Sequence, residues 1–290
     1  MSSTTMPGTI ANDRLWPADK TCLKVRFLNG KPWQKEMVQR CVEEHYHTVH
    51  MRIRFQFLKT YTLESSDIRV RFGQESHSLV GIDAEKWLFG HTMELNLDVH
   101  EYYPEWQRRR LRQQTILHEF GHALGMFHQH QHPDFIADWD FAYLEKKYGW
   151  SATMVRDDYQ PLENGQEKLG PYDPLSVMHY PVDEGDTLNS VSPIGINWVL
   201  SEGDKRYLTL AYPKPEPAFS KKRKERSSNV TTITGGSTAK INGEGLEDAT
   251  GSVAIYYEED FHLEPVLGFL GAALIFFIPR LYRWIQDSNT

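Results

Sequence analysis

The stretch HEFGHALGMFH, residues 118–128, decides the fold. On a helix, His118 and His122 lie on one face, so both imidazoles can reach one Zn²⁺ ion at about 2.0–2.1 Å. Glu119 points beside that ion rather than at it, which suits a base acting on metal-bound water. His128 returns as a third ligand. Three protein ligands leave one position open for water, the arrangement of catalytic rather than structural zinc sites.

The shorter pattern HExxH has a second interpretation, because two surface histidines beside a solvated glutamate also arise by chance on a helix. The extended pattern HExxHxxGxxH adds Gly125 and His128 at fixed offsets. Glycine lets the chain leave the helix at positive φ with little cost, which is what the return of His128 requires. The longer motif therefore favours a metal site.

A second motif, SVMHY, lies at residues 176–180. At this point the chain resembles the metzincins, which are named for a methionine turn (the Met-turn) beneath the zinc site. The tyrosine two residues after the methionine is similar to the astacin family. The resemblance covers residues 15–213. Further segments that carry it are IRVRF at 68–72, GIDA at 81–84, Thr92 and Met93, and YDPLS at 172–176.

The resemblance implies an α+β fold: a metzincin-type catalytic domain with a twisted mixed sheet over a long active-site helix. A smaller, irregular C-terminal subdomain would hold the Met-turn. Glu119 would be the general base and later the proton shuttle, Met178 the hydrophobic floor, and Tyr180 a stabiliser of the oxyanion. The implied zinc ligands are His118, His122 and His128.

The expected function is a zinc-dependent metalloendopeptidase, which hydrolyses peptide bonds of proteins through a zinc-bound water activated by Glu119. The strand expected at residues 92–97 (TMELNL) would form the sheet edge to which an extended substrate adds. The alternative is a catalytically inactive, membrane-tethered zinc-binding or adaptor protein with the same fold. The presence of the ligands, the base and Tyr180 favours the active enzyme.

Several positions depart from the astacin pattern. Gln129 stands where astacins usually carry a glutamate that helps to bind the mature N-terminus. The usual disulfide cysteines and an inhibitory leader segment before residue 20 are missing, so activation by N-terminal trimming is not expected. His130 and His132 do not fit the ligand spacing, and we expect them to be polar and partly exposed. His179 is expected to pack or to form hydrogen bonds.

Hydrophobic periodicity predicts the elements around the motifs. Alternation indicates strands in residues 21–29, 51–58, 68–72 and 92–97, and a first helix spans positions 33–45. Pro104 opens the long helix, a short helix lies near 139–148, and Ser201 caps a helix over 202–211. The predicted domains are a polar N-terminal arm (1–20), a catalytic domain (21–213), a flexible linker (214–260) and a hydrophobic C-terminal tail (261–290).

The composition of the 290-residue chain is that of a globular protein, with 40% hydrophobic and 24% charged residues. A net charge of -7 argues against nucleic acid as a partner. No signal peptide is visible, which predicts an intracellular protein. Residues 265–284 begin with an uncharged run that is short for a spanning helix. The two interpretations are a tail anchor in a membrane and a buried or partner-binding helix.

Overall fold

The computed structural model describes residues 9–11, 14–59, 62–98, 103–162, 167–169, 171–189 and 191–215. These residues belong to one compact unit. The expected linker beyond residue 215 and the apolar tail at 265–284 lie outside the described residues, so the tail anchor and the intracellular location stay predictions. Within the described ranges, no helix has the length and apolar character needed to cross a membrane.

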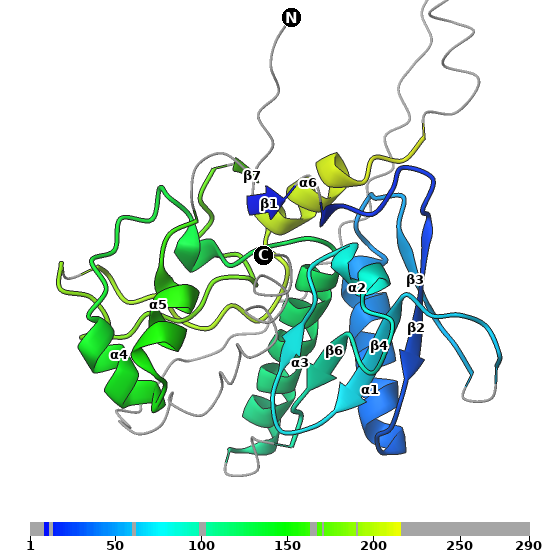
Figure 1. Cartoon of the computed structure of the whole chain (residues 1–290), viewed down its shortest axis with the longest axis horizontal. Coiled ribbons are helices and arrows are strands. Elements are labelled where there is room, and N and C mark those ends of the chain that lie inside the picture. Colours follow the sequence, from blue (N-terminus) through cyan, green and yellow to red (C-terminus); the bar gives the residue numbers. More distant parts are fainter. Residues whose placement is uncertain are drawn as a thin grey trace, which may run out of the picture. The chain divides into compact units, whose positions relative to one another are not determined.

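A five-stranded sheet forms one half of this unit, in the order β3-β2-β4-β6-β5 (Figure 1). The strands β2, β3, β4 and β6 are parallel, and β5 is antiparallel to β6. Helix α1 (Pro32–Tyr46) connects β2 to β3, which are parallel, and so forms a β-α-β unit from the first predicted strand, helix and second strand. The strand bounds are Cys22–Phe27 (β2), Arg54–Phe57 (β3), Ile68–Phe72 (β4), His77–Ser78 (β5) and Met93–Leu95 (β6).

The core lies between the sheet and the two long helices, α1 and α3 (Glu105–Ala123). Leu23 and Val25 alternate along β2 with more exposed neighbours and are both fully buried. Phe55 of β3 meets Phe120 of α3 edge to face, with ring centroids 5.1 Å apart. Tyr46, at the end of α1, donates its hydroxyl to Leu117 O at 2.5 Å. The expected α+β fold with a mixed sheet over the active-site helix is confirmed.

The sheet edge differs from the expected one. Strand β6 is not at the edge, because β5 pairs with it through His77 opposite Glu94 and Ser78 opposite Met93. A further backbone hydrogen bond, from Leu79 N to Thr92 O at 2.9 Å, extends the ladder. A strand of two residues is too short to show an alternating pattern, so its sequence carried no signal. Among the described residues, β5 is therefore the last strand on this side of the sheet.

The segment before residue 21 takes part in the packing, although the sequence suggested a polar arm over residues 1–20. The indole of Trp16 is 2% exposed, and its Nε1–H donates to Ala123 O at 2.7 Å. The Arg52 guanidinium donates to Trp16 O at 3.0 Å. Strand β1 (Thr9–Ala11) pairs antiparallel with β7 (Glu167–Leu169). The packed unit therefore includes Trp16, upstream of the expected boundary.

The second half of the unit has little regular structure, as expected, and packs around its own apolar cluster. The short helix α4 (Phe141–Tyr148) and the last helix α6 (Glu202–Ala211) match the predicted ranges. Ser201 caps α6, since its side chain accepts from Asp204 N at 2.8 Å. Helix α5 (Ala152–Tyr159) was not predicted, and it lies beside α4 (Figure 1).

Candidate metal centre

His118 and His122 lie in the last turns of α3, and both are buried, with 2% and 6% of their surface exposed. The helix ends beyond Ala123, where Gly125 has φ +84° and donates its N–H to His122 O at 2.7 Å. This left-handed conformation favours glycine, as the motif predicted. The chain then turns back and places His128, which is 8% exposed, beside the two helical histidines.

The three imidazoles converge through their Nε2 atoms. His128 Nε2 lies 3.1 Å from both His118 Nε2 and His122 Nε2. His118 Nδ1 is 3.0 Å from Val177 O, and His122 Nδ1 is 2.8 Å from Met126 O. Because a carbonyl oxygen can only accept, both Nδ1 atoms carry the proton and both Nε2 atoms present a lone pair. Lone pairs that point at one place repel one another, and a cation there would relieve the repulsion.

Burial also keeps these histidines in the form that binds a metal. Desolvation lowers the pKa of His118 to about 4 and the pKa of His122 to about 3. Desolvation likewise places the pKa of His128 well below its ordinary value. The three rings are therefore neutral at physiological pH, and a neutral imidazole is the usual ligand of zinc. The residues present fit a Zn²⁺ ion.

Glu119 follows His118 in the same helix and is 1% exposed. Its Oε2 atom is buried and has no hydrogen-bond partner among the described residues. Desolvation raises the pKa of this carboxyl well above its ordinary value. A carboxyl group that the fold leaves unpaired beside the three histidines is available to exchange a proton there.

The Met-turn (residues 176–180) lies against the metal-ligand helix and against α6. Met178 is fully buried, and its carbonyl accepts from Gln129 N at 3.1 Å. Asp204 of α6 accepts from Ser176 Oγ at 2.6 Å and from Val177 N at 2.9 Å. Asp204 thus holds the turn whose Val177 carbonyl orients His118. Sequence reasoning missed this role, because an acidic residue three positions after Ser201 is also an ordinary helix cap.

Tyr180 ends the Met-turn and lies among the histidines, as predicted. Its ring centroid is 4.5 Å from that of His128 and 5.9 Å from that of His118. The side chain is 1% exposed, and desolvation raises the pKa of its phenol well above the ordinary value. The phenol therefore keeps its proton at neutral pH and can act as a hydrogen-bond donor.

The matrixin family model matches residues 16–160, half of the chain. The chain belongs to the matrixin family. It is therefore a metalloprotease of the metzincin superfamily, and zinc is the metal that this family implies. The expectation of a zinc metalloendopeptidase is confirmed at this level, and the narrower likeness to astacins stays a prediction.

The chain is also similar to several solved structures. A structure of myroilysin has 28% sequence identity and a TM-score of 0.62, covering 72% of this chain and 100% of that one. A second myroilysin structure has 27% identity and a TM-score of 0.50, covering 69% and 86%. High choriolytic enzyme 1, a hatching enzyme zinc-protease from Oryzias latipes (medaka fish), has 15% identity and a TM-score of 0.47, covering 71% and 97%. No curated protein sequence matches the chain.

The histidines that follow the matrixin zinc motif are buried, which corrects the expectation of partial exposure. His130 and His132 are each 1% exposed. The 3₁₀ helix η2 (Gln129–Gln131) lies within this segment, and its residues are buried. The polar run HQHQHPD gives no hydrophobic pattern from which this burial could be predicted. His179 forms the expected hydrogen bonds, accepting from Tyr172 OH at 2.8 Å and lying 2.6 Å from Tyr180 O through Nδ1.

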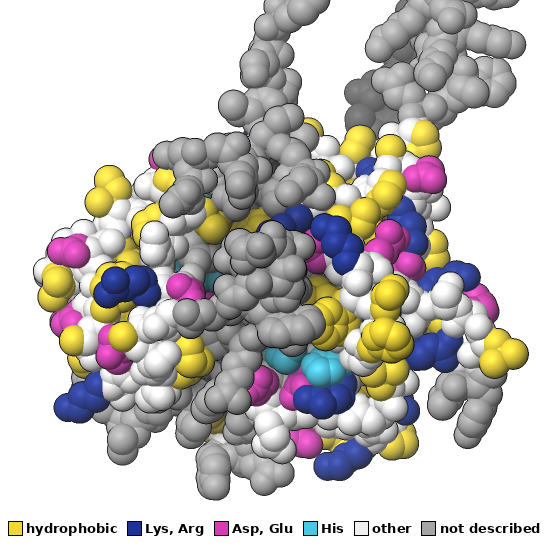
Figure 2. Space-filling view, in the orientation of Figure 1, with side chains coloured by type: hydrophobic (Ala, Val, Ile, Leu, Met, Phe, Trp, Pro, Cys, Tyr) yellow, Lys and Arg dark blue, Asp and Glu magenta, His cyan; other side chains and the backbone are white. Residues whose placement is uncertain are grey.

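A second group of metal-ligand residue types, His77, His91 and Glu94, lies at the sheet edge of this matrixin unit. The Nε of Arg71 donates to Glu94 Oε2 at 2.8 Å, and Glu75 N donates to Oε1 at 3.1 Å. Both carboxylate oxygens are thus engaged, one of them by a cation, so we assign no metal to this group. On the face shown in Figure 2, acidic and basic side chains are interspersed, which fits the mild net charge.

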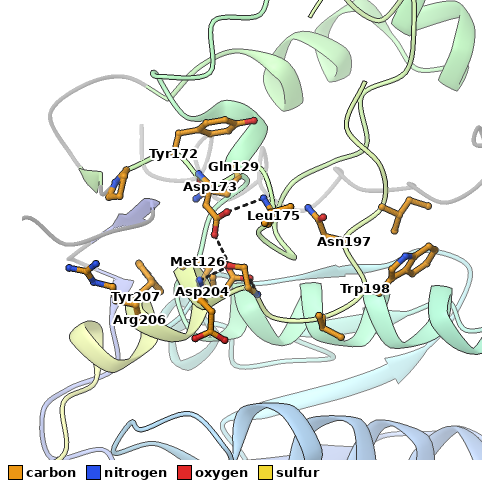
Figure 3. A pocket seen from close by; sticks show the side chains of 16 residues that line it. Met126, Gln129, Tyr172, Asp173, Leu175, Asn197, Trp198, Asp204, Arg206 and Tyr207 are labelled. Carbon is orange, nitrogen blue, oxygen red and sulfur yellow. Dashed lines mark hydrogen bonds between the residues drawn. The ribbon is translucent and has the colours of Figure 1, made fainter. Parts of the chain in front are cut away.

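A cavity of about 710 Å³ lies on the α6 side of the Met-turn and is separate from the three histidines. Figure 3 shows Asp173 at its wall, where the carboxylate accepts from Leu175 N at 2.9 Å and from Ser201 Oγ at 2.6 Å. Gln129 also lines the cavity, and its side-chain oxygen accepts from Asp173 N at 3.2 Å. The amide that replaces the glutamate of astacins therefore has a partner within the fold.

Proposed function

We propose that this chain is an astacin-like zinc endopeptidase that cleaves proteins or peptides. The observation that carries this proposal is the convergence of three neutral imidazoles. In two of them, His118 and His122, the Nδ1–H group is held by a backbone carbonyl. The ion would be held by the Nε2 atoms of His118, His122 and His128. When bound there, zinc polarises the scissile carbonyl and acidifies water.

The remaining chemistry belongs to Glu119 and Tyr180. Glu119 takes a proton from the attacking water and delivers it to the nitrogen of the leaving amine. Its burial supports this role, because a carboxyl whose pKa is raised holds and releases protons nearer to neutral pH. The Tyr180 hydroxyl, which keeps its own proton, donates a hydrogen bond to the oxyanion that forms on the scissile carbonyl.

The substrate would bind in an extended conformation along β5, because β5 is the last strand of the sheet order. This placement replaces the edge first expected at residues 92–97. In this kind of pairing the hydrogen bonds go to the main chain of the substrate, and no free chain terminus is required. This suits cleavage at internal peptide bonds.

The test compares wild type with Glu119→Gln in the hydrolysis of casein and a quenched peptide, with and without a chelator. Wild-type activity should vanish with the chelator, and Glu119→Gln should lose turnover while its zinc content per chain stays that of wild type. The matched control is Glu202→Gln, which changes a side chain that is 90% exposed on α6. A zinc-loaded wild type without chelator-sensitive hydrolysis would instead support the inactive zinc-binding protein.

A further inference from the structure

The ring of His130 lies flat against the ring of Tyr180. Their centroids are 4.1 Å apart and their planes differ by 21°. The same His130 ring stacks on His128, with centroids 5.0 Å apart and planes 27° apart. His130 therefore touches both a metal-ligand histidine and the tyrosine, although it is not one of the three converging ligands.

His130 is itself held by a hydrogen bond to α5 and by two further aromatic rings. Its Nε2 lies 2.8 Å from Asp158 O, in the last turn of α5, and a carbonyl can only accept, so Nε2 carries the proton. Tyr159 and Trp139 flank the ring, with centroids 5.2 and 6.2 Å away. Two points of support, a hydrogen bond and aromatic packing, leave this side chain little freedom to rotate.

We propose that His130 is a positioning residue that fixes the plane of the Tyr180 ring and so aims its hydroxyl at the reacting carbonyl. This inference rests on the proposed role of Tyr180. A ring that lies flat against the Tyr180 ring at this distance limits how far the tyrosine ring can tilt. The flat imidazole, anchored to α5, supplies that restraint.

The ring, rather than the N–H group, is the part of His130 that acts on Tyr180. Stacked aromatic pairs contribute a measurable amount beyond the burial of area. An interaction that aims a group at the oxyanion acts in the transition state and hardly in the ground state, so its loss lowers kcat and leaves KM unchanged. The size of one aromatic pair corresponds to about a 2- to 10-fold fall in kcat.

Two substitutions separate the ring from the hydrogen bond. His130→Gln keeps an N–H donor for Asp158 O and loses the ring, whereas His130→Phe keeps a ring and loses the donor. On zinc-loaded enzyme, we expect His130→Gln to lower kcat by about 2- to 10-fold with KM unchanged, and His130→Phe to keep most of kcat while its Tm falls. The reverse pattern would show that the hydrogen bond matters and the stacking does not.

The Tyr180→Phe background tests whether His130 acts through the tyrosine hydroxyl. In that background His130→Gln should cause no further fall in kcat, because no hydroxyl remains to be aimed. An equal fall in both backgrounds, or a loss of zinc from His130→Gln, would place its effect on His128 and overturn the proposal.

A measurement without catalysis separates this inference from the proposed function. In protein labelled with ¹³C-tyrosine, the Tyr180 signals are those missing from Tyr180→Phe. Wild type should show a slowly flipping Tyr180 ring, and His130→Gln should show faster flipping. Equal ring-flipping rates of Tyr180 in wild type and His130→Gln would refute the positioning role of His130, even in an active enzyme. Faster flipping in His130→Gln would support that role even if no peptide were cleaved.

Discussion

Gly121→Ala is expected to destabilise the protein, because α3 packs closely against Met178 of the Met-turn at Gly121. A Cβ atom at this position would lie 2.5 Å from Met178 Sδ and 3.4 Å from both Met178 Cε and Tyr46 OH. Real Cβ atoms do not approach other atoms to 2.5 Å. Met178 is fully buried, so its side chain cannot yield by moving into solvent.

Two opposing terms set the magnitude. Alanine favours a helix interior over glycine by about 1 kcal/mol. Overpacking of a well-filled core costs about 1–3 kcal/mol, and a contact this short belongs at the upper end of that range. The sulfur lies in the middle of the side chain rather than at its flexible end, so the whole methionine must shift. We expect the free energy of unfolding to fall by about 2 kcal/mol.

The assay is urea denaturation of the chelator-treated protein, with zinc affinity measured separately by competition. Zinc affinity should also fall, because the shifted turn carries the Val177 carbonyl that orients His118. Gly195→Ala is the control, since a Cβ there meets nothing within 4 Å. Met178→Ala should recover part of the loss when combined with Gly121→Ala. A Gly121→Ala protein as stable as wild type would refute the reasoning.

Two other substitutions test the supports of the fold. Trp16→Phe removes the N–H donor to Ala123 O and should lower the free energy of unfolding by about 1–3 kcal/mol in urea titrations. Trp33 is much more exposed than Trp16, so Trp33→Phe is the control, and an equal loss of stability in the two variants would contradict this prediction. Burial raises the pKa of Asp204 from 3.8 to about 6, so the fold favours the protonated form of this carboxyl. Its contribution to the stability of the fold is therefore complete below pH 3.8 and is lost as the pH rises through about 6. Asp204→Asn cannot ionise, so its stability relative to wild type should rise by about 2 kcal/mol between pH 4 and pH 7, and a difference independent of pH would count against the shift.

The metal site could be predicted from the sequence because its geometry is largely local. The spacing of His118 and His122 follows from the helix period, and the positive φ of Gly125 follows from the need to return His128. Tyr180 is different, because its position depends on the packing of a distant segment. Only the resemblance to a known motif placed it among the histidines.

The features that escaped prediction depend on contacts between distant segments. Strand β5 has two residues and owes its conformation to pairing with β6. Trp16 lies in a polar stretch, and its burial is decided by the carbonyl of Ala123, which lies far along the chain. His130 lies in a run of polar residues, and it is buried by contacts with α5 and with Tyr180, both of which are distant in the sequence. Hydrophobic periodicity reports only local preferences, so it cannot detect partners that are distant in the sequence.

The orientation of a metal-ligand histidine depends on the last helix of the described unit. The Val177 carbonyl fixes the proton of His118 on Nδ1, the Val177 N–H is bound by Asp204, and Asp204 also accepts from Ser201 N at 3.0 Å. The carboxylate that caps α6 is thus the one that holds the Met-turn. A helix cap is formed only when the helix itself is in place. It follows that the Nε2 lone pair of His118 is aimed correctly only after α6 has docked on the turn.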